Sequence, residues 1–167
     1  AHAWSELHGI AATGLRFFTV YGPWGRPDMA IYRFTRAILN GKPIRLYNGG
    51  CMRRDFTYVD DAVEVIMRTM TAAPAKTRVM NVGGGRPVEL SHLVATMEQV
   101  LELPAKMEML PMQAGDVPLT SADTKRLREV LNYAPTTDLE DGIRKFAAWF
   151  RNYHGLSRTD QKRVLME

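Results

Sequence analysis

The sequence predicts an α/β fold in which short buried strands alternate with amphipathic helices. Two segments, TGLRFF at residues 13–18 and RVMNV at residues 78–82, are short and rich in apolar, aromatic and β-branched side chains. Several longer segments instead carry apolar residues at helical spacing. Strands that alternate with helices are typical of a parallel sheet covered by helices, and we expect both strands to belong to one such sheet.

The first predicted elements follow in order along the chain. Residues 1–9 end at Gly9 and have no capping residue in front, so they are expected to be the end of a helix in a chain that begins partway through an α/β pattern. A helix is predicted over residues 29–39. The segments PIRLY (residues 43–47) and RDFTYV (residues 54–59) are predicted to be strands that pair with each other across the turn NGG.

The next predicted helix runs to Met70, with Asp60 or Asp61 as its cap. Its apolar face is expected to consist of four residues at helical spacing: Val63, Ile66, Met67 and Met70. After RVMNV, the pattern predicts a helix near residues 91–101, the strand KMEML and a short helix that begins at Asp123.

The last predicted helix begins with a capping box formed by Thr137 and Glu140. Its apolar residues recur at helical spacing and are expected to face the core: Ile143, Phe146, Ala147 and Phe150. We expect one folded unit over residues 1–155, followed by a polar tail over residues 156–167.

The composition limits the possible partners. The 167 residues include 22 Lys and Arg against 18 Asp and Glu, and the basic residues are scattered along the chain rather than gathered into one run. This pattern favours a small anionic ligand and no nucleic acid. A single cysteine, Cys51, and the lack of any long apolar segment favour a cytoplasmic protein with no membrane partner.

The glycine cluster Gly83-Gly84-Gly85 directly follows a predicted strand, as a dinucleotide-binding loop would. A G-x-G-x-x-G pattern that starts at Gly83 would need glycine at position 88, where the chain has Val88, and Pro87 would obstruct a helix there. The cluster is therefore predicted to be a turn, and no cofactor-binding residue is assigned.

A series of motifs in the chain resembles one known family. The segments LRFFTVYGPWGRPDMA, RRDFTYVDDAVEVI, NVGGG and GDVP occur in the order found in the extended short-chain dehydrogenases/reductases, within their epimerase and dehydratase branch. The chain is most similar to the UDP-glucuronate 4-epimerases, over residues 1 to about 153. The resemblance implies the C-terminal portion of a doubly wound Rossmann-type parallel sheet, together with the small α/β lobe that binds the sugar nucleotide.

The resemblance also implies an NAD-dependent reaction that interconverts UDP-glucuronate and UDP-galacturonate through a 4-keto sugar. Complete members of the family carry an N-terminal glycine fingerprint and a catalytic Tyr-x-x-x-Lys pair, and none of the six tyrosines of this chain has Lys four positions later. We therefore expect the chain alone to retain no NAD, to supply no catalytic residue and to be inactive. No metal-ligand pattern is present, since the histidines are dispersed.

The loop after TGLRFF holds the residues expected to recognise the acidic sugar. The resemblance places Thr19 and Arg26 beside the hexose, where a planar guanidinium and a hydroxyl can donate to one carboxylate. The alternative for Arg26 is a structural role in which it binds loop carbonyls.

The nucleotide itself is expected to contact three further residues. The resemblance implies that Arg54 binds the diphosphate, that Tyr47 flanks the uracil, and that Asp116 binds a ribose hydroxyl. Core packing is an equally good explanation for Tyr47. Arg53 is expected to be a solvated charge, and Gln113 stands where some relatives carry arginine.

Three alternatives to an epimerase part remain open. The chain could be a UDP-sugar-binding module or remnant without activity, another epimerase or dehydratase of the same family, or a general anion binder. A sheet cut off from its other half would expose an apolar edge, so we expect self-association or a partner that supplies the missing N-terminal half.

Overall fold

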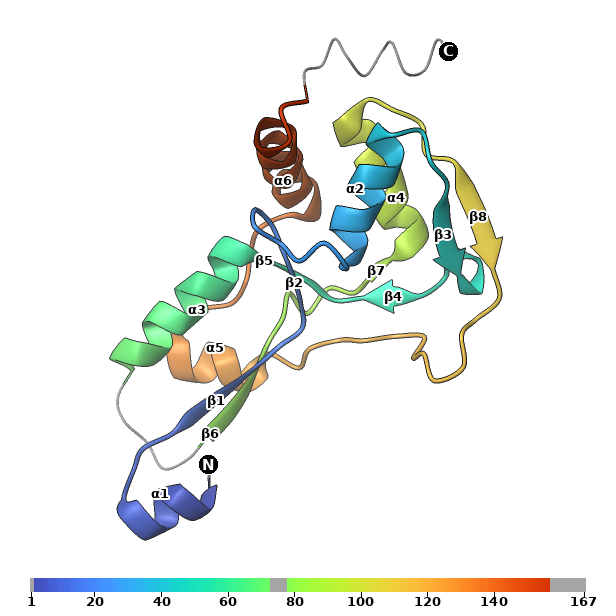
Figure 1. The fold of residues 1–167 in the computed structure, drawn as a ribbon. Helices are drawn as coiled ribbons and strands as arrows, with labels where there is room; N and C mark the ends of the chain where they lie inside the picture. The colour runs from blue at the N-terminus through green and yellow to red at the C-terminus, as the bar shows by residue number, and fades with distance from the viewer. Residues whose placement is uncertain (1, 73–77, 157–167) are drawn as a thin grey trace.

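The computed structural model of the protein describes residues 2–72 and 78–156, and Figure 1 shows the arrangement of its elements. In chain order these are α1 (His2–His8), β1 (Thr13–Phe17), β2 (Thr19–Tyr21), α2 (Ala30–Leu39), β3 (Ile44–Tyr47), the 3-10 turn η1 (Asn48–Gly50), β4 (Arg53–Arg54), β5 (Phe56–Tyr58), α3 (Val59–Thr71), β6 (Arg78–Val82), β7 (Val88–Glu89), α4 (Leu90–Leu101), β8 (Met107–Leu110), α5 (Lys125–Leu131) and α6 (Leu139–Tyr153).

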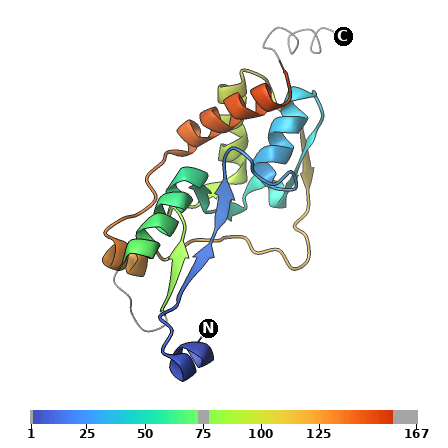
Figure 2. The same ribbon diagram turned by 60° about the vertical axis from the view of Figure 1, so that its left-hand side comes forward.

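Parallel strand pairs join β1 to β6 and β2 to β5. Strand β1 pairs with β6 in parallel, with Leu15 opposite Met80 and Phe17 opposite Val82. Strand β2 continues the direction of β1 and pairs in parallel with β5. Figures 1 and 2 both show β1 and β6 side by side, with α3 next to them. The α/β class is therefore confirmed, and TGLRFF and RVMNV lie in one parallel sheet as expected, where they are direct neighbours.

The predicted pairing of PIRLY with RDFTYV is wrong. Strand β3 pairs in parallel with β8, while the second segment is divided into β4, which pairs with β7, and β5, which pairs with β2. The turn η1 leaves β3 through residues with positive φ, among them Asn48 (51°) and Gly49 (60°), and the chain does not return along β3. Each short strand instead meets a partner that is distant in sequence.

Two apolar clusters stabilise the fold. The larger one lies among α2, α4, α6 and strand β3, and it buries the predicted apolar face of the last helix, including Phe146 and Phe150. The smaller one packs Val65 of α3 and Leu127 of α5 against Met80 of β6. The larger cluster supports the lobe that contains β3 and β8, and the smaller one supports the pair β1 and β6.

Helix α3 differs from its prediction in two ways. It begins at Val59 without a side-chain cap, and Asp61 is buried and accepts hydrogen bonds from the Tyr133 hydroxyl (2.7 Å) and the Thr137 N–H (3.0 Å).

The face of α3 that was expected to be buried is exposed instead, with Met67 54% exposed, because Ala62 and Val65 are the apolar residues that face the core. The predicted Asp cap and the predicted buried face are therefore wrong.

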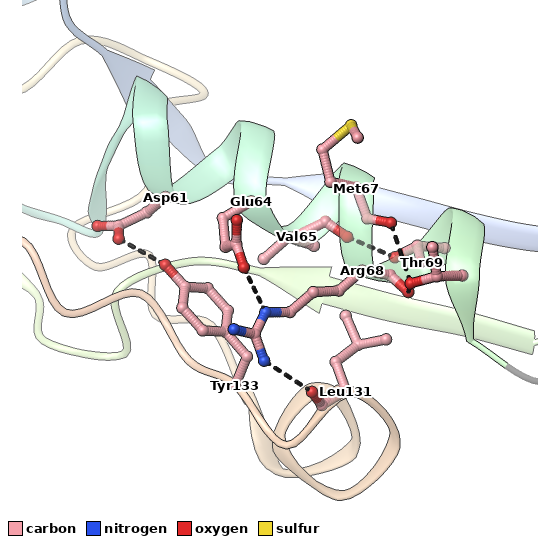
Figure 3. Close-up of polar contacts among 9 residues, drawn as sticks. Asp61, Glu64, Val65, Met67, Arg68, Thr69, Leu131 and Tyr133 are labelled. Carbon is pink, nitrogen blue, oxygen red and sulfur yellow. Dashed lines mark hydrogen bonds and ion pairs between the residues drawn. The ribbon is translucent and has the colours of Figure 1, made fainter.

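Figure 3 shows how α3 is joined to the segment after α5. The Tyr133 hydroxyl points at Asp61, while Arg68 lies over the Tyr133 ring at 4.7 Å and donates to Glu64 (2.5 Å) on its own helix. Burial, followed by the bond to Asp61, raises the pKa of Tyr133. The hydroxyl therefore stays protonated and remains a donor across the physiological range.

The start of α6 also differs from its prediction. Its cap is Asp138, whose carboxylate accepts from the Glu140 N–H at 3.0 Å, so the predicted Thr137 capping box is wrong. None of the helices in residues 2–72 and 78–156 is long and apolar enough to cross a membrane.

Candidate functional site

The loop at residues 22–29 connects β2 to α2 and lies at the carboxyl end of a parallel strand, where open α/β sheets place ligands. Gly22 has a φ of 141°, and a Cβ there would lie 2.5 Å from a methyl group of Val59, so this close approach to α3 requires glycine. The Gly25 N–H donates to the Gly22 carbonyl (3.0 Å) and closes a turn. One side of the loop is therefore fixed against α3.

The other side of the loop is fixed against α6 by aromatic rings. Trp24 has a φ of 63°, a left-handed conformation that non-glycine residues seldom adopt. Its ring lies 5.5 Å from the Trp149 ring and 5.3 Å from the Tyr153 ring. These contacts hold a strained residue in place and fix the path of the chain that leads to Arg26.

Thr19 and Arg26, the residues expected to recognise the acidic sugar, lie close together. They line one small pocket with Tyr21 and Met29, and Arg26 also lines a neighbouring cavity of about 330 Å³. The Arg26 side chain is 74% exposed and forms two hydrogen bonds to one carboxylate, Nη2 to Asp28 Oδ2 (2.6 Å) and Nε to Asp28 Oδ1 (3.1 Å). These bonds raise the pKa of Arg26 and lower that of Asp28.

Arg54 and Asp116 form a second pair. The Arg54 side chain is only 17% exposed, and its Nη2 lies 3.7 Å from Asp116 Oδ1. Its Nη1 donates to the backbone oxygen of Arg53 (3.0 Å). Arg53 itself is exposed, in agreement with the expected solvated charge, and it also donates to the Pro87 carbonyl (3.2 Å).

The two pairs are linked through neighbouring strands. The Thr19 N–H donates to the Asp55 carbonyl (3.2 Å), and Thr19 lies opposite Phe56 in the parallel register. Arg54 therefore lies on the strand segment that adjoins Thr19. Arg54 lines neither the small pocket nor the cavity of about 330 Å³ described above.

Tyr47 ends strand β3 and is partly buried against the larger apolar cluster. The Ile44 N–H bonds to Lys106 of the strand segment that contains β8 (2.7 Å), and backbone groups alternate in direction along a strand. The N–H groups of Arg45 and Tyr47 consequently point away from β8. Tyr47 thus has a core-packing role, and the backbone beside it has polar groups on the edge of β3 that pairs with no other strand in residues 2–72 and 78–156.

Asp55 is a central residue that the sequence analysis missed. It is completely buried, and its carboxylate accepts from the N–H groups of Gly84 (2.8 Å), Gly85 (3.0 Å) and Ala122 (2.8 Å). We call this cluster, Asp55 with residues 83–85 and 122, the Asp55 cluster. Its sequence signal is weak, because an aspartate between Arg54 and an aromatic strand gives no indication of which distant N–H groups it will meet.

The Asp55 cluster also bears on cofactor binding. Phosphates bind glycine-rich loops through free backbone N–H groups, and here the N–H groups of Gly84 and Gly85 already bond to Asp55. These residues therefore do not fit the diphosphate of a dinucleotide. Within residues 2–72 and 78–156, no three potential metal ligands lie together.

The chain is similar to known proteins of one family. The model of the NAD-dependent epimerase/dehydratase family matches residues 1–83, and the chain belongs to this family. A probable UDP-glucuronate 4-epimerase from Rhizobium meliloti is 44% identical over 92% of this chain and 50% of that protein. UDP-glucuronate 4-epimerase 4 from Arabidopsis thaliana is 43% identical over 92% of this chain and 39% of that protein.

Solved structures show the same likeness. The UDP-glucuronic acid 4-epimerase from Bacillus cereus, in complex with UDP-glucuronic acid and NAD, has a TM-score of 0.85 and 29% identity over 91% of this chain and 49% of that one. MoeE5 in complex with UDP-glucuronic acid and NAD has a TM-score of 0.81 and 36% identity over 84% of this chain and 47% of that one. The chain thus spans about half the length of most of these relatives.

Proposed function

We propose that this chain forms the UDP-hexuronate-binding part of an NAD-dependent 4-epimerase that interconverts UDP-glucuronate and UDP-galacturonate. The observation that carries the proposal is the placement of Thr19 and Arg26 on one pocket at the carboxyl end of β2. A guanidinium and a hydroxyl at this point supply the donors that a sugar carboxylate needs and that a neutral hexose does not use.

The nucleotide would be bound by residues on neighbouring strands. Arg54 is largely buried, so its charge is little screened by water and would act strongly on a diphosphate. Asp116, which faces Arg54, would accept from a ribose hydroxyl while it keeps the guanidinium in position. Tyr47 would lie against the uracil, with the free backbone edge of β3 available to the polar atoms of the base.

Bound NAD supplies hydride transfer at the sugar C4 in a complete enzyme of this kind. The residues of this chain would bind and orient the sugar nucleotide for that step. Arg26 has an additional task, since a 4-keto uronic acid is a β-keto acid, and a carboxylate held by two N–H donors cannot rotate freely into the geometry for loss of carbon dioxide. We expect the chain alone to bind the sugar nucleotide without converting it.

The proposal is tested by calorimetric titration of the chain with UDP, UDP-glucose and UDP-glucuronate. We expect UDP-glucuronate to bind more tightly than UDP-glucose. Arg26→Ala should lower UDP-glucuronate affinity about tenfold, to the level of UDP-glucose, because a carboxylate loses its charged donors. Arg54→Ala should weaken all three ligands about tenfold or more.

Arg144→Ala is the matched control, since Arg144 is an exposed arginine that pairs with Glu140 on α6. It should change none of the three affinities. Equal binding of UDP-glucose and UDP-glucuronate by the unmodified chain would contradict the proposal.

A further inference from the structure

We infer that Asp28 is a specificity-determining residue: its carboxylate occupies the face of the Arg26 guanidinium that the sugar carboxylate would bind, so an acidic sugar must displace it. This inference rests on the proposed function. It assigns to Asp28 the role of an internal competitor that acts only on ligands with a carboxylate.

The geometry of the pair supports this role. Arg26 donates through Nε and Nη2 to the two oxygens of Asp28, at 3.1 and 2.6 Å, which is the two-point contact that a guanidinium makes with any carboxylate. The same N–H groups cannot bind two carboxylates in this way at once. A sugar carboxylate that uses this side of Arg26 therefore replaces Asp28.

The ion pair between Arg26 and Asp28 can dissociate readily. The side chains of Arg26 and Asp28 are 74% and 65% exposed, and exposed ion pairs are weak because water and salt screen them. Asp28 follows Arg26 by only two positions, and the Met29 N–H donates to the Arg26 carbonyl (3.1 Å), so the competitor always lies within reach.

The displaced carboxylate also has a second positive neighbour. The charge of Arg33 contributes to the lowered pKa of Asp28, after the larger contribution from the bond to Arg26. Asp28 therefore remains near a cation when it leaves Arg26. A neutral hexose has no carboxylate that could replace Asp28 on Arg26, so the competition affects uronates alone.

The test is Asp28→Asn, which keeps the shape of the side chain and removes its charge. We expect UDP-glucuronate affinity to rise about two- to fivefold, the size expected from the loss of one exposed ion pair. UDP-glucose serves as the internal reference, because the loss of one negative charge from the chain acts equally on the diphosphate of both ligands. The measured quantity is the ratio of the two affinities, obtained by calorimetry at one fixed ionic strength.

Two further variants make the result specific. Glu108→Gln removes a carboxylate from a comparable exposed pair, Arg45 Nε to Glu108 Oε2 at 3.1 Å, and should leave the ratio unchanged. In an Arg26→Ala background, Asp28→Asn should no longer raise the ratio.

The opposite results overturn the inference in distinct ways. If Asp28→Asn lowers the ratio of UDP-glucuronate affinity to UDP-glucose affinity, Asp28 holds the guanidinium in its binding position. If the ratio is unchanged, the sugar does not meet this side of Arg26. If the unmodified chain does not prefer UDP-glucuronate and Arg26→Ala has no effect, the proposed function fails, and the inference fails with it.

Discussion

Two glycine-containing segments follow parallel strands in this protein, and they have opposite properties. The loop at residues 22–29 follows β2 and presents Arg26 to solvent, paired with an exposed carboxylate. Residues 83–85 follow β6, and the N–H groups of Gly84 and Gly85 bond to the buried carboxylate of Asp55. Glycines after a strand therefore do not define a ligand site by themselves, because a ligand can bind only where the polar groups of the segment can be reached.

The two carboxylates differ for the same reason. Asp28 is in water, where its pair with Arg26 is screened and can exchange. Asp55 is fully buried and accepts hydrogen bonds from several N–H groups that would otherwise have no partner, so its carboxylate is held in place. One segment is suited to ligand exchange, and the other to holding strands and loops together.

The largest expected effect comes from breaking the Asp55 cluster. Asp55→Asn should destabilise the protein by about 2–4 kcal/mol, because one carboxylate oxygen becomes an N–H₂ group that faces buried N–H donors. Urea denaturation followed by far-UV circular dichroism should show a lower midpoint with an unchanged slope. Asp28→Asn, made in the exposed loop, should leave the midpoint where it is. Equal stability of the two variants would remove the distinction between the segments.

A smaller effect is expected from filling space in the same cluster. A Cβ at position 83 would lie 2.4 Å from the Ala122 Cβ, so Gly83→Ala should cost about 1–3 kcal/mol through overpacking. Gly14→Ala is the control, because a Cβ there meets only ordinary contacts, the nearest at 3.5 Å from a Val79 methyl group. Thermal unfolding of both variants checks this prediction, and a Gly83→Ala midpoint no lower than that of Gly14→Ala would contradict it.

The smallest effect concerns the strain in the exposed loop. Because Trp24 has a positive φ, Trp24→Gly should be more stable than Trp24→Ala by about 1 kcal/mol, although both lose the contacts with the α6 rings. The order should be reversed at Trp4, which lies within helix α1, where glycine is about 1 kcal/mol less favourable than alanine. Urea titration of the four variants measures both differences. The same order at both positions would show that the left-handed conformation of Trp24 carries no strain.

The predicted binding residues differ in how far apart they lie in the sequence. Thr19 and Arg26 share a pocket because both lie within one strand and the loop that follows it, which keeps them close whatever the rest of the fold does. Arg54 and Asp116 are 62 positions apart and still meet at 3.7 Å. The family resemblance, and no local pattern, selected each of them, and only the structure shows that they form a pair. Asp55 could not be found in this way, since its role depends on Gly84, Gly85 and Ala122 from other parts of the chain.

The sequence by itself determined the features that depend on spacing within one element. Composition identified the strands at residues 13–18 and 78–82, and apolar periodicity identified the buried face of α6. The residue at position 88 excluded a dinucleotide fingerprint. Only the tertiary structure decided that β3 pairs with β8, that Asp61 bonds to Tyr133, and that Gly84 bonds to Asp55. The physical reason is that short strands and buried polar groups take their partners from distant segments, and packing selects among partners that the local sequence makes equally acceptable.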